Sequence, residues 1–280
     1  MHHNIIRAFV IGTAVLWAAS PAPAEGQSSD QSVTVAFSDT SRPGLLRVDL
    51  IVGSITVKGT NRRDVRVSSS RDESRGARQR ATPSPEPGLR RLNQPHGFSI
   101  QEERNTMTIS SDITSGPVDF DIEVPMRTNL RLTTVNGSRI AVDGVEGEIE
   151  LQNVNGSITV TNLAGSVLAS TTNGPVRAAL TRVTAGKPMA FTSLNGEVDV
   201  TLPASVKADV KLRSDHGDVL TDFDIQLKSG PSPSVEDTRS SGGGRYRVEL
   251  NQSIYGSING GGPEIELRTF NGRVVLRKGT

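Results

Sequence analysis

A short motif built around glycine recurs along the chain at nearly constant spacing, and it constrains the fold more than any other feature. In its clearest form, Asn-Gly is followed by a small or charged residue and then by Ile or Val. Self-similarity at a fixed period is typical of repeat architectures and outranks any local prediction of a turn. The copies, aligned on glycine, are VGSITV (52–57), NGSRIAV (136–142), EGEIEL (146–151), NGSITV (155–160), AGSVLA (164–169), NGPVRA (173–178), NGEVDV (195–200), HGDVLT (216–221), YGSINGG (255–261) and NGRVVL (271–276).

The direction of the motif separates two architectures. An antiparallel meander with a hairpin at each glycine would tend toward mirror symmetry around each turn. In this chain the apolar pair always follows the glycine, as Ile158 and Val160 follow Gly156. Such a directional repeat suits strands that stack in parallel, with two half-turns making one coil. We therefore predict an all-β fold, a parallel β-solenoid with an N-terminal cap of antiparallel strands.

In a solenoid the motif marks a corner of each coil. Glycine supplies a positive φ there, and the apolar residues two and four positions later point into the core, so Ile158 and Val200 are predicted to be buried. Two explanations of the asparagines remain open. Their side chains stack as a ladder, or Asn is present only because it tolerates positive φ. These asparagines are Asn136, Asn155, Asn173 and Asn195.

The N-terminus matches a secretory signal peptide over residues 1–24. Arg7 precedes an apolar run from Ala8 to Ala19, and the small residues Ala22-Pro23-Ala24 follow it, so cleavage is expected after Ala24. The run is too short for a comfortable membrane span of about 20 residues. We expect an exported protein without a transmembrane segment, located in the periplasm or at the cell surface.

A flexible linker over 25–32 and a single domain over 33–280 are predicted to follow the signal. Two stretches interrupt the β pattern, at 71–97 and 228–244, and both hold too few apolar residues to offset the entropy of ordering them. They are predicted to be mobile insertions. The segment 71–91 holds six arginines against three acidic residues, which suits either a solvated loop or docking to an anionic envelope polymer.

Composition excludes several classes of function. The chain has no cysteine, so disulfides, thiol catalysis and thiolate metal sites are excluded. Its 31 Lys and Arg residues balance 30 Asp and Glu residues, which gives no basis for binding nucleic acid. Aromatic residues make up 4% of the chain, which argues against a platform for stacking sugars or nucleotides.

No catalytic, cofactor-binding or metal site emerges from the remaining residues. The mature chain has two histidines, and of these His216 fills the slot before glycine that Asn fills in neighbouring repeats, while His96 has no evident partner. The carboxylates Asp215, Asp218, Asp222 and Asp224 lie close in sequence, but their spacing matches neither an EF-hand nor a calcium-binding β-roll. The stretch SINGGGPE (257–264) lacks the Gly-Lys-Ser/Thr ending of a phosphate-binding loop.

Three passages resemble the bacterial DUF4097 family of adhesin-like β-solenoid proteins. They are LRVDLIVGSITVKGTNRRDVRV (46–67), VDFDIEVPMRTNLRLTTVNGSRIAVDGVEGEIELQNVNGSITV (118–160) and FTSLNGEVDVTLP (191–203). The resemblance covers nearly the whole mature chain and implies a fold, but it brings no catalytic residues. The insertion at 71–97 departs from the family pattern.

Three functions are consistent with these observations. The first is a non-catalytic binding or adhesion scaffold that recognises an envelope or surface polymer or protein. The second is a structural envelope protein without a ligand. A polysaccharide-active enzyme ranks last because no catalytic set is visible, and the link to β-helix lyases is one of fold alone.

Overall fold

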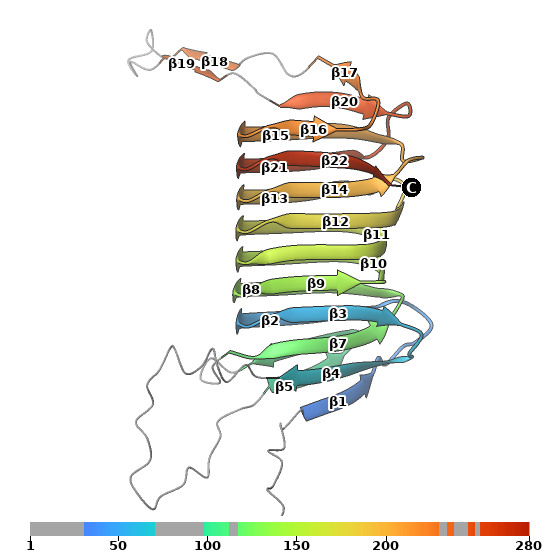
Figure 1. Ribbon diagram of the computed structural model, residues 1–280. Helices are drawn as coiled ribbons and strands as arrows, with labels where there is room; N and C mark the ends of the chain where they lie inside the picture. Colours follow the sequence, from blue (N-terminus) through green and yellow to red (C-terminus); the bar gives the residue numbers. More distant parts are fainter. Residues whose placement is uncertain are drawn as a thin grey trace, which may run out of the picture.

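The computed structural model describes residues 31–70, 98–111, 117–229, 234–237, 246–249 and 253–279, and all regular structure in these ranges is β-strand (Figure 1). The prediction of an all-β chain is confirmed. The described residues contain no helix with the length and apolarity needed to cross a membrane. The predicted signal peptide, most of the linker, the insertion at 71–97, His96 and much of 228–244 lie outside the described residues.

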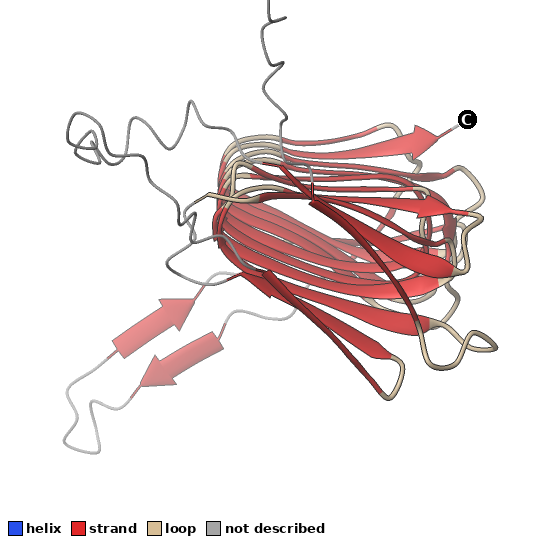
Figure 2. Ribbon diagram, turned by 90° about the horizontal axis from the view of Figure 1, so that it is seen from below, coloured by secondary structure: helices blue, strands red, loops and turns tan. Residues whose placement is uncertain are grey.

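Seven copies of the motif each form one coil, made of a strand, a corner at the glycine and a second strand. The prediction of a corner is wrong for EGEIEL, AGSVLA and YGSINGG, because Gly147, Gly165 and Gly256 lie within strands. Neighbouring coils pair in parallel along both strands, which excludes a hairpin at each Asn-Gly. Seen along the stack, the strands form two layers (Figure 2). In spatial order the coils are β2 (Gly44–Val52) with β3 (Ile55–Thr60), β8 (Thr128–Asn136) with β9 (Arg139–Asp143), β10 (Glu146–Asn155) with the first part of β11 (Ser157–Asn173), the rest of β11 with β12 (Val176–Val183), β13 (Met189–Asn195) with β14 (Val198–Pro203), β21 (Glu264–Asn271) with β22 (Val274–Gly279), and β15 (Ala208–His216) with β16 (Val219–Thr221).

The spatial order of the coils differs from their order in the sequence at both ends. The β21–β22 coil lies between the β13–β14 and β15–β16 coils, because β21 pairs with both β13 and β15. At the other end, β2 pairs with β8 and with β6 (Thr106–Ser111), and β3 pairs with β9 and with β7 (Asp119–Pro125). In Figure 1 the blue β2 and β3 therefore lie between green strands, and the dark red β21 and β22 lie between gold and orange ones. Each of these two coils is held by hydrogen bonds on both sides.

Antiparallel strands close both ends of the stack. At the N-terminal end β4 pairs with β1 and β7, and β5 pairs with β6, as predicted for a cap. At the other end β20 pairs antiparallel with β15 and β17, which the sequence did not predict. The sheet is therefore mixed, and the predicted parallel architecture holds only for its middle. The remaining strands are β1 (Gln31–Ala36), β4 (Asp64–Ser70), β5 (Phe98–Glu103), β17 (Gln226–Lys228), β20 (Ile254–Ile258) and the separate hairpin of β18 (Ser234–Asp237) with β19 (Tyr246–Glu249).

Columns of aliphatic side chains fill the space between the two layers. Ile158 and Val200 are both 0% exposed, which confirms the predicted inward positions. Full burial of such a side chain contributes roughly 1.5–3 kcal/mol, so the columns account for much of the stability of the stack. One column runs through Leu46, Leu130, Ile149, Val167, Met189, Ile265 and Val210.

Candidate binding surface

The asparagines before the corner glycines form a continuous hydrogen-bonded ladder on the outside of the stack. Nδ2 of Asn155 and of each asparagine above it donates to Oδ1 of the asparagine in the coil below, at 2.8–2.9 Å. The positive-φ explanation is wrong for these asparagines, because among the described non-glycine residues positive φ occurs only at Arg104, Asn105, Asn162 and Asn259. The ladder runs through Asn136, Asn155, Asn173, Asn195 and Asn271, and all five are exposed.

The corner glycines are required because neighbouring corners approach closely. A Cβ added at Gly156 would lie 1.8 Å from the carbonyl oxygen of Gly137, and one added at Gly174 would lie 2.3 Å from that of Gly156. Gly156 also has a φ of +155°, as the prediction of a positive-φ corner requires. At Gly196 the described backbone shows no positive φ, yet a Cβ there would lie 2.1 Å from the Gly174 oxygen. Lack of space is therefore the more general reason for glycine.

A column of buried polar side chains lies directly inside the corner. Each member sits three residues before a corner glycine and hydrogen-bonds the carbonyl oxygen of the neighbouring corner, as Thr171 Oγ1 donates to Gly156 O at 2.9 Å and Thr269 Oγ1 to Gly196 O at 2.7 Å. These bonds satisfy carbonyls that would otherwise be buried without a partner, which costs about 1–3 kcal/mol each. The buried members are Thr134, Asn153, Thr171, Ser193 and Thr269, and the half-buried Ser214 continues the column.

This column was not predicted, although the sequence contains a pattern that indicates it. The motifs TVNG, NVNG, TTNG, SLNG, TFNG and SDHG all begin with Ser, Thr or Asn. In an alternating strand that position faces inward, where a hydroxyl needs a hydrogen-bond partner. A polar residue repeated on the core side was therefore sufficient to predict an internal hydrogen-bond column.

An exposed apolar column runs beside the ladder. Its side chains lie two residues before each corner glycine and point outward, and Leu194 and Phe270 are 47% and 42% exposed. We call the ladder and this column together the corner edge. The column consists of Ile51, Val135, Val154, Leu194 and Phe270, and the half-buried Thr172 takes the position between Val154 and Leu194.

The corner edge carries no charge over these coils, and several charges on the two faces of the stack are paired across strands. On one face Lys211 binds Glu266 at 3.0 Å, and this hydrogen bond raises the pKa of the lysine. On the other face Asp199 binds Arg277 at 2.9 Å, which raises the pKa of the arginine. Asp143 accepts a hydrogen bond from Thr161, and this bond lowers the pKa of the carboxyl. A neutral strip bordered by neutralised charges suits a neutral ligand better than a charged one.

Comparison with known proteins identifies the family. The family model Toastrack DUF4097 matches residues 95–258. The chain belongs to this family. Among solved structures, the DUF4097 chain is similar to a candidate cell adhesion protein from Clostridium sporogenes, with 10% identity and a TM-score of 0.42, over 89% of this chain and 100% of that one. A candidate adhesin from Bacteroides fragilis matches with 11% identity and a TM-score of 0.39, over 89% and 96% of the two chains. No curated protein matches the chain.

His216 in the DUF4097 chain takes the position that the ladder asparagines take in neighbouring coils, as predicted, and like them it does not have a positive φ. It lies opposite Asn271, and its ring meets Phe270 edge-on with a centroid distance of 4.8 Å. This contact gives His216 a packing role at the upper end of the corner edge.

The four aspartates that lie close in sequence, at 215, 218, 222 and 224, do not converge on one point. Asp215 binds Arg213 at 2.6 Å, and Oδ1 of Asp222 accepts the Lys278 amide at 2.6 Å. Within the described ranges, no three His, Asp or Glu side chains come together in a way that could hold a metal ion. SINGGGPE forms the turn from β20 to β21, where Asn259, Gly260 and Gly261 have positive φ.

A shallow hollow of about 180 Å³ lies over β16 and β22. Its floor includes Leu220 and Val275, and Arg273 and Arg277 border it. Glu197 binds Arg273 at 3.2 Å, and Asp199 binds Arg277. Because these arginines are already paired with carboxylates, the hollow offers no unpaired charge for an anionic substrate.

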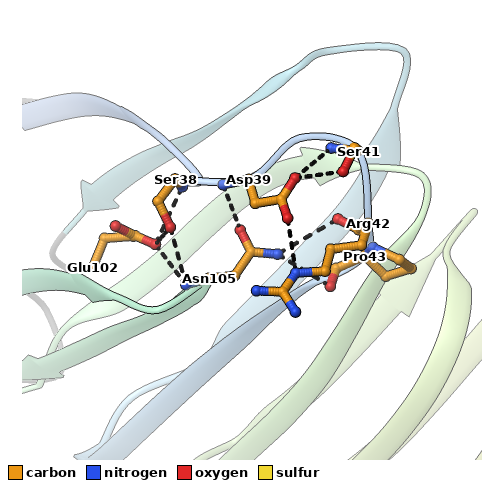
Figure 3. A network of polar contacts seen from close by, with 7 residues as sticks. All are labelled: Ser38, Asp39, Ser41, Arg42, Pro43, Glu102 and Asn105. Carbon is orange, nitrogen blue, oxygen red and sulfur yellow. Dashed lines mark hydrogen bonds and ion pairs between the residues drawn. The ribbon is translucent and has the colours of Figure 1, made fainter.

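A polar network clamps the loop between β1 and β2 at the N-terminal end (Figure 3). Oε1 of Glu102 accepts hydrogen bonds from the Ser38 hydroxyl at 2.8 Å and from the Asn105 amide at 2.9 Å. The bonds from Ser38, followed by that from Asn105, lower the pKa of Glu102. The Asn105 side chain is buried and bonds Asp39, Arg42 and Pro43. The network fixes the entry into the first coil.

Proposed function

We propose that this DUF4097 chain is an exported, non-catalytic binding scaffold of the adhesion type, and that the corner edge is its ligand-binding surface. The observation that carries the proposal is the pairing of an exposed asparagine ladder with an exposed apolar column. Aligned apolar residues on the outside of a soluble protein commonly mark a site of interaction.

The chemistry of the edge favours an extended, neutral polymer. Asn155, Asn173 and Asn195 each use one N–H and one lone pair of the side-chain amide within the ladder. A second donor and a second acceptor on each side chain are left for a ligand. These free groups repeat at the strand spacing of about 4.8 Å, beside apolar contacts with the same repeat. A polymer such as a surface polysaccharide can present hydroxyl groups and apolar faces along its length, so many weak contacts add up.

A solenoid-type stack suits this role. The parallel coils keep the edge straight and rigid, so little ordering entropy is lost on binding. Export to the periplasm or cell surface is proposed from the signal-like sequence of residues 1–24. Protease digestion of a C-terminally tagged protein on intact cells would favour the surface, and protection until the cells are permeabilised would favour the periplasm.

The binding proposal is tested with two exposed leucines. Leu194 lies in the corner edge and is 47% exposed, whereas Leu168 is 49% exposed on the outer face of β11, away from the corner. We expect Leu194→Lys to weaken retention on immobilised envelope polysaccharide about tenfold, since a buried leucine contributes 1.5 kcal/mol or more. The matched control, Leu168→Lys, is expected to bind like the wild type.

Two results would contradict the proposal. Equal binding by both variants would exclude the corner edge as the contact surface. Lack of retention of the wild type by any polymer of the envelope would favour the alternative, a structural envelope protein without a ligand.

A further inference from the structure

The corner asparagines share a chemical liability that the fold controls. In an Asn-Gly pair, the glycine backbone nitrogen can attack the asparagine side-chain carbonyl carbon. The new C–N bond closes a succinimide ring and ammonia leaves, and water then opens either imide carbonyl to give aspartate or isoaspartate. The reaction needs a glycine nitrogen that can turn toward the side chain. The Asn-Gly pairs begin at Asn136, Asn155, Asn173, Asn195, Asn259 and Asn271.

Four of these pairs hold the attacking nitrogen in a hydrogen bond. The amide of Gly156 donates to Asn173 O at 2.8 Å, and that of Gly174 donates to Asn195 O at 3.0 Å. The amides of Gly196 and Gly272 bond the next coil in the same way, at 2.8 and 3.2 Å. Attack at these corners requires the coil to open locally, so the stack suppresses the reaction.

Gly137 differs because its corner holds one extra residue. In NGSRIAV the first inward residue, Ile140, comes three positions after glycine, whereas Ile158 comes two positions after Gly156, and these isoleucines lie opposite each other. The extra residue, Ser138, shifts the corner peptides out of the common pattern. Among the described residues, none accepts a hydrogen bond from the Gly137 amide.

The leaving amide nitrogen of Asn136, its Nδ2, is also less restrained than those of the other corner asparagines. Its Oδ1 accepts a bond from Asn155 at 2.9 Å, but Val52 occupies the same column in the coil below and offers no acceptor to its Nδ2. By contrast, Nδ2 of Asn259 donates to two backbone carbonyls, at 3.0 and 2.8 Å. Within the described ranges, neither the attacking nitrogen nor the leaving amide of the Asn136–Gly137 pair is therefore held by a hydrogen bond.

We propose that Asn136 is the site of spontaneous deamidation in the folded protein, by attack of the Gly137 nitrogen. In the aspartate product the carboxylate keeps the oxygen that accepts the bond from Asn155, so the ladder survives, whereas isoaspartate adds a carbon to the main chain at this corner. It places a negative charge at the lower end of an otherwise neutral corner edge. The inference depends on the corner geometry alone and holds whether or not the corner edge binds a polymer.

The test is peptide mapping of the folded, full-length mature protein after incubation at mildly alkaline pH. We expect Asn136 to convert at least about tenfold faster than Asn155, Asn173 or Asn195, because those corners must first open. In denaturant the difference should disappear. Similar rates at all corners of the folded protein, or faster conversion at Asn155, would overturn the proposal.

A second variant tests the role of the free ladder end. Val52→Asn places an acceptor beneath Asn136, and Val52 is only half-buried, so the stack should tolerate the change. We expect conversion at Asn136 to slow several-fold while the other corners keep their rates. An unchanged rate in a folded Val52→Asn protein would show that the leaving amide is not restrained by the ladder.

Discussion

Replacement of a corner glycine by alanine tests how tightly the coils are stacked. In Gly156→Ala the new Cβ would lie 1.8 Å from the carbonyl oxygen of Gly137. A tight C···O contact needs roughly 3.3 Å, so the two corners would have to part by about 1.5 Å. Backbone hydrogen bonds tolerate a donor–acceptor range of only about 0.5 Å, so those that join the corners must break.

The expected loss follows from these bonds. Parting the corners breaks the bond from Asn153 to Gly137 O and that from the Ser157 amide to Ser138 O, each 3.3 Å long. At about 1 kcal/mol per bond, with a further 1–2 kcal/mol for alanine at this φ, Gly156→Ala should lose about 3–4 kcal/mol.

Gly186→Ala is the matched control for this variant. Gly186 has a φ of +75°, but a Cβ there would meet nothing within 4 Å, so only the backbone cost of about 1–2 kcal/mol applies. The assay is urea unfolding followed by circular dichroism for the two variants and the wild type. Equal destabilisation by the two substitutions would refute the argument that close stacking dictates glycine at the corner.

Three further changes have expected outcomes. Ile158→Asp buries an unpaired charge at a position that is 0% exposed, so it should lower the free energy of unfolding by more than about 4 kcal/mol. The control Thr159→Asp, on the outer face, should melt close to the wild type. Normal melting of Ile158→Asp would contradict the inward assignment. Asn153→Thr should raise stability by about 1 kcal/mol, because it removes a buried Oδ1 that has no hydrogen-bond partner, and a lower urea midpoint would count against this. The hydrogen bonds from Ser38 lower the pKa of Glu102 from its usual value of 4.5, so the ionised carboxylate stabilises the fold above that pH and this stabilisation is lost as the pH falls below it. Acid titration should therefore destabilise the wild type more than Glu102→Gln. Parallel curves of stability against pH for the two proteins would exclude the effect.

Local features of the fold could be predicted from the sequence because they depend on local chemistry. The inward positions of Ile158 and Val200 follow from the alternation of a strand, and the corners follow from the glycine spacing. The asparagine ladder was one of two open explanations, and hydrogen bonds across coils decide in its favour.

The order of the coils could not be predicted, because similar repeats can pair with one another in more than one order. The motif NGRVVL is compatible with two positions for the β21–β22 coil. It could lie at the end of the stack, beyond β15 and β16, or next to β13 and β14, where the structure places it. Closure of both ends by antiparallel strands is also a long-range effect. Of the corner edge, the asparagine ladder was one of the two explanations that the sequence offered, whereas the exposed apolar column beside it was not predicted.

Alignment of these corners is the central claim, and paired cysteines test it most directly because the chain has none of its own. Leu194 lies beside Phe270, and Asp215 lies one coil further along the same column. Cysteines at adjacent coils are about 5 Å apart, within reach of a disulfide, whereas a separation of two coils exceeds the limit of about 7 Å. We predict that Leu194→Cys with Phe270→Cys forms an intramolecular disulfide on mild oxidation and that Leu194→Cys with Asp215→Cys does not. The opposite result would mean that the coils stack in the order of the sequence, with the charged Asp215 between Leu194 and Phe270 in the corner edge.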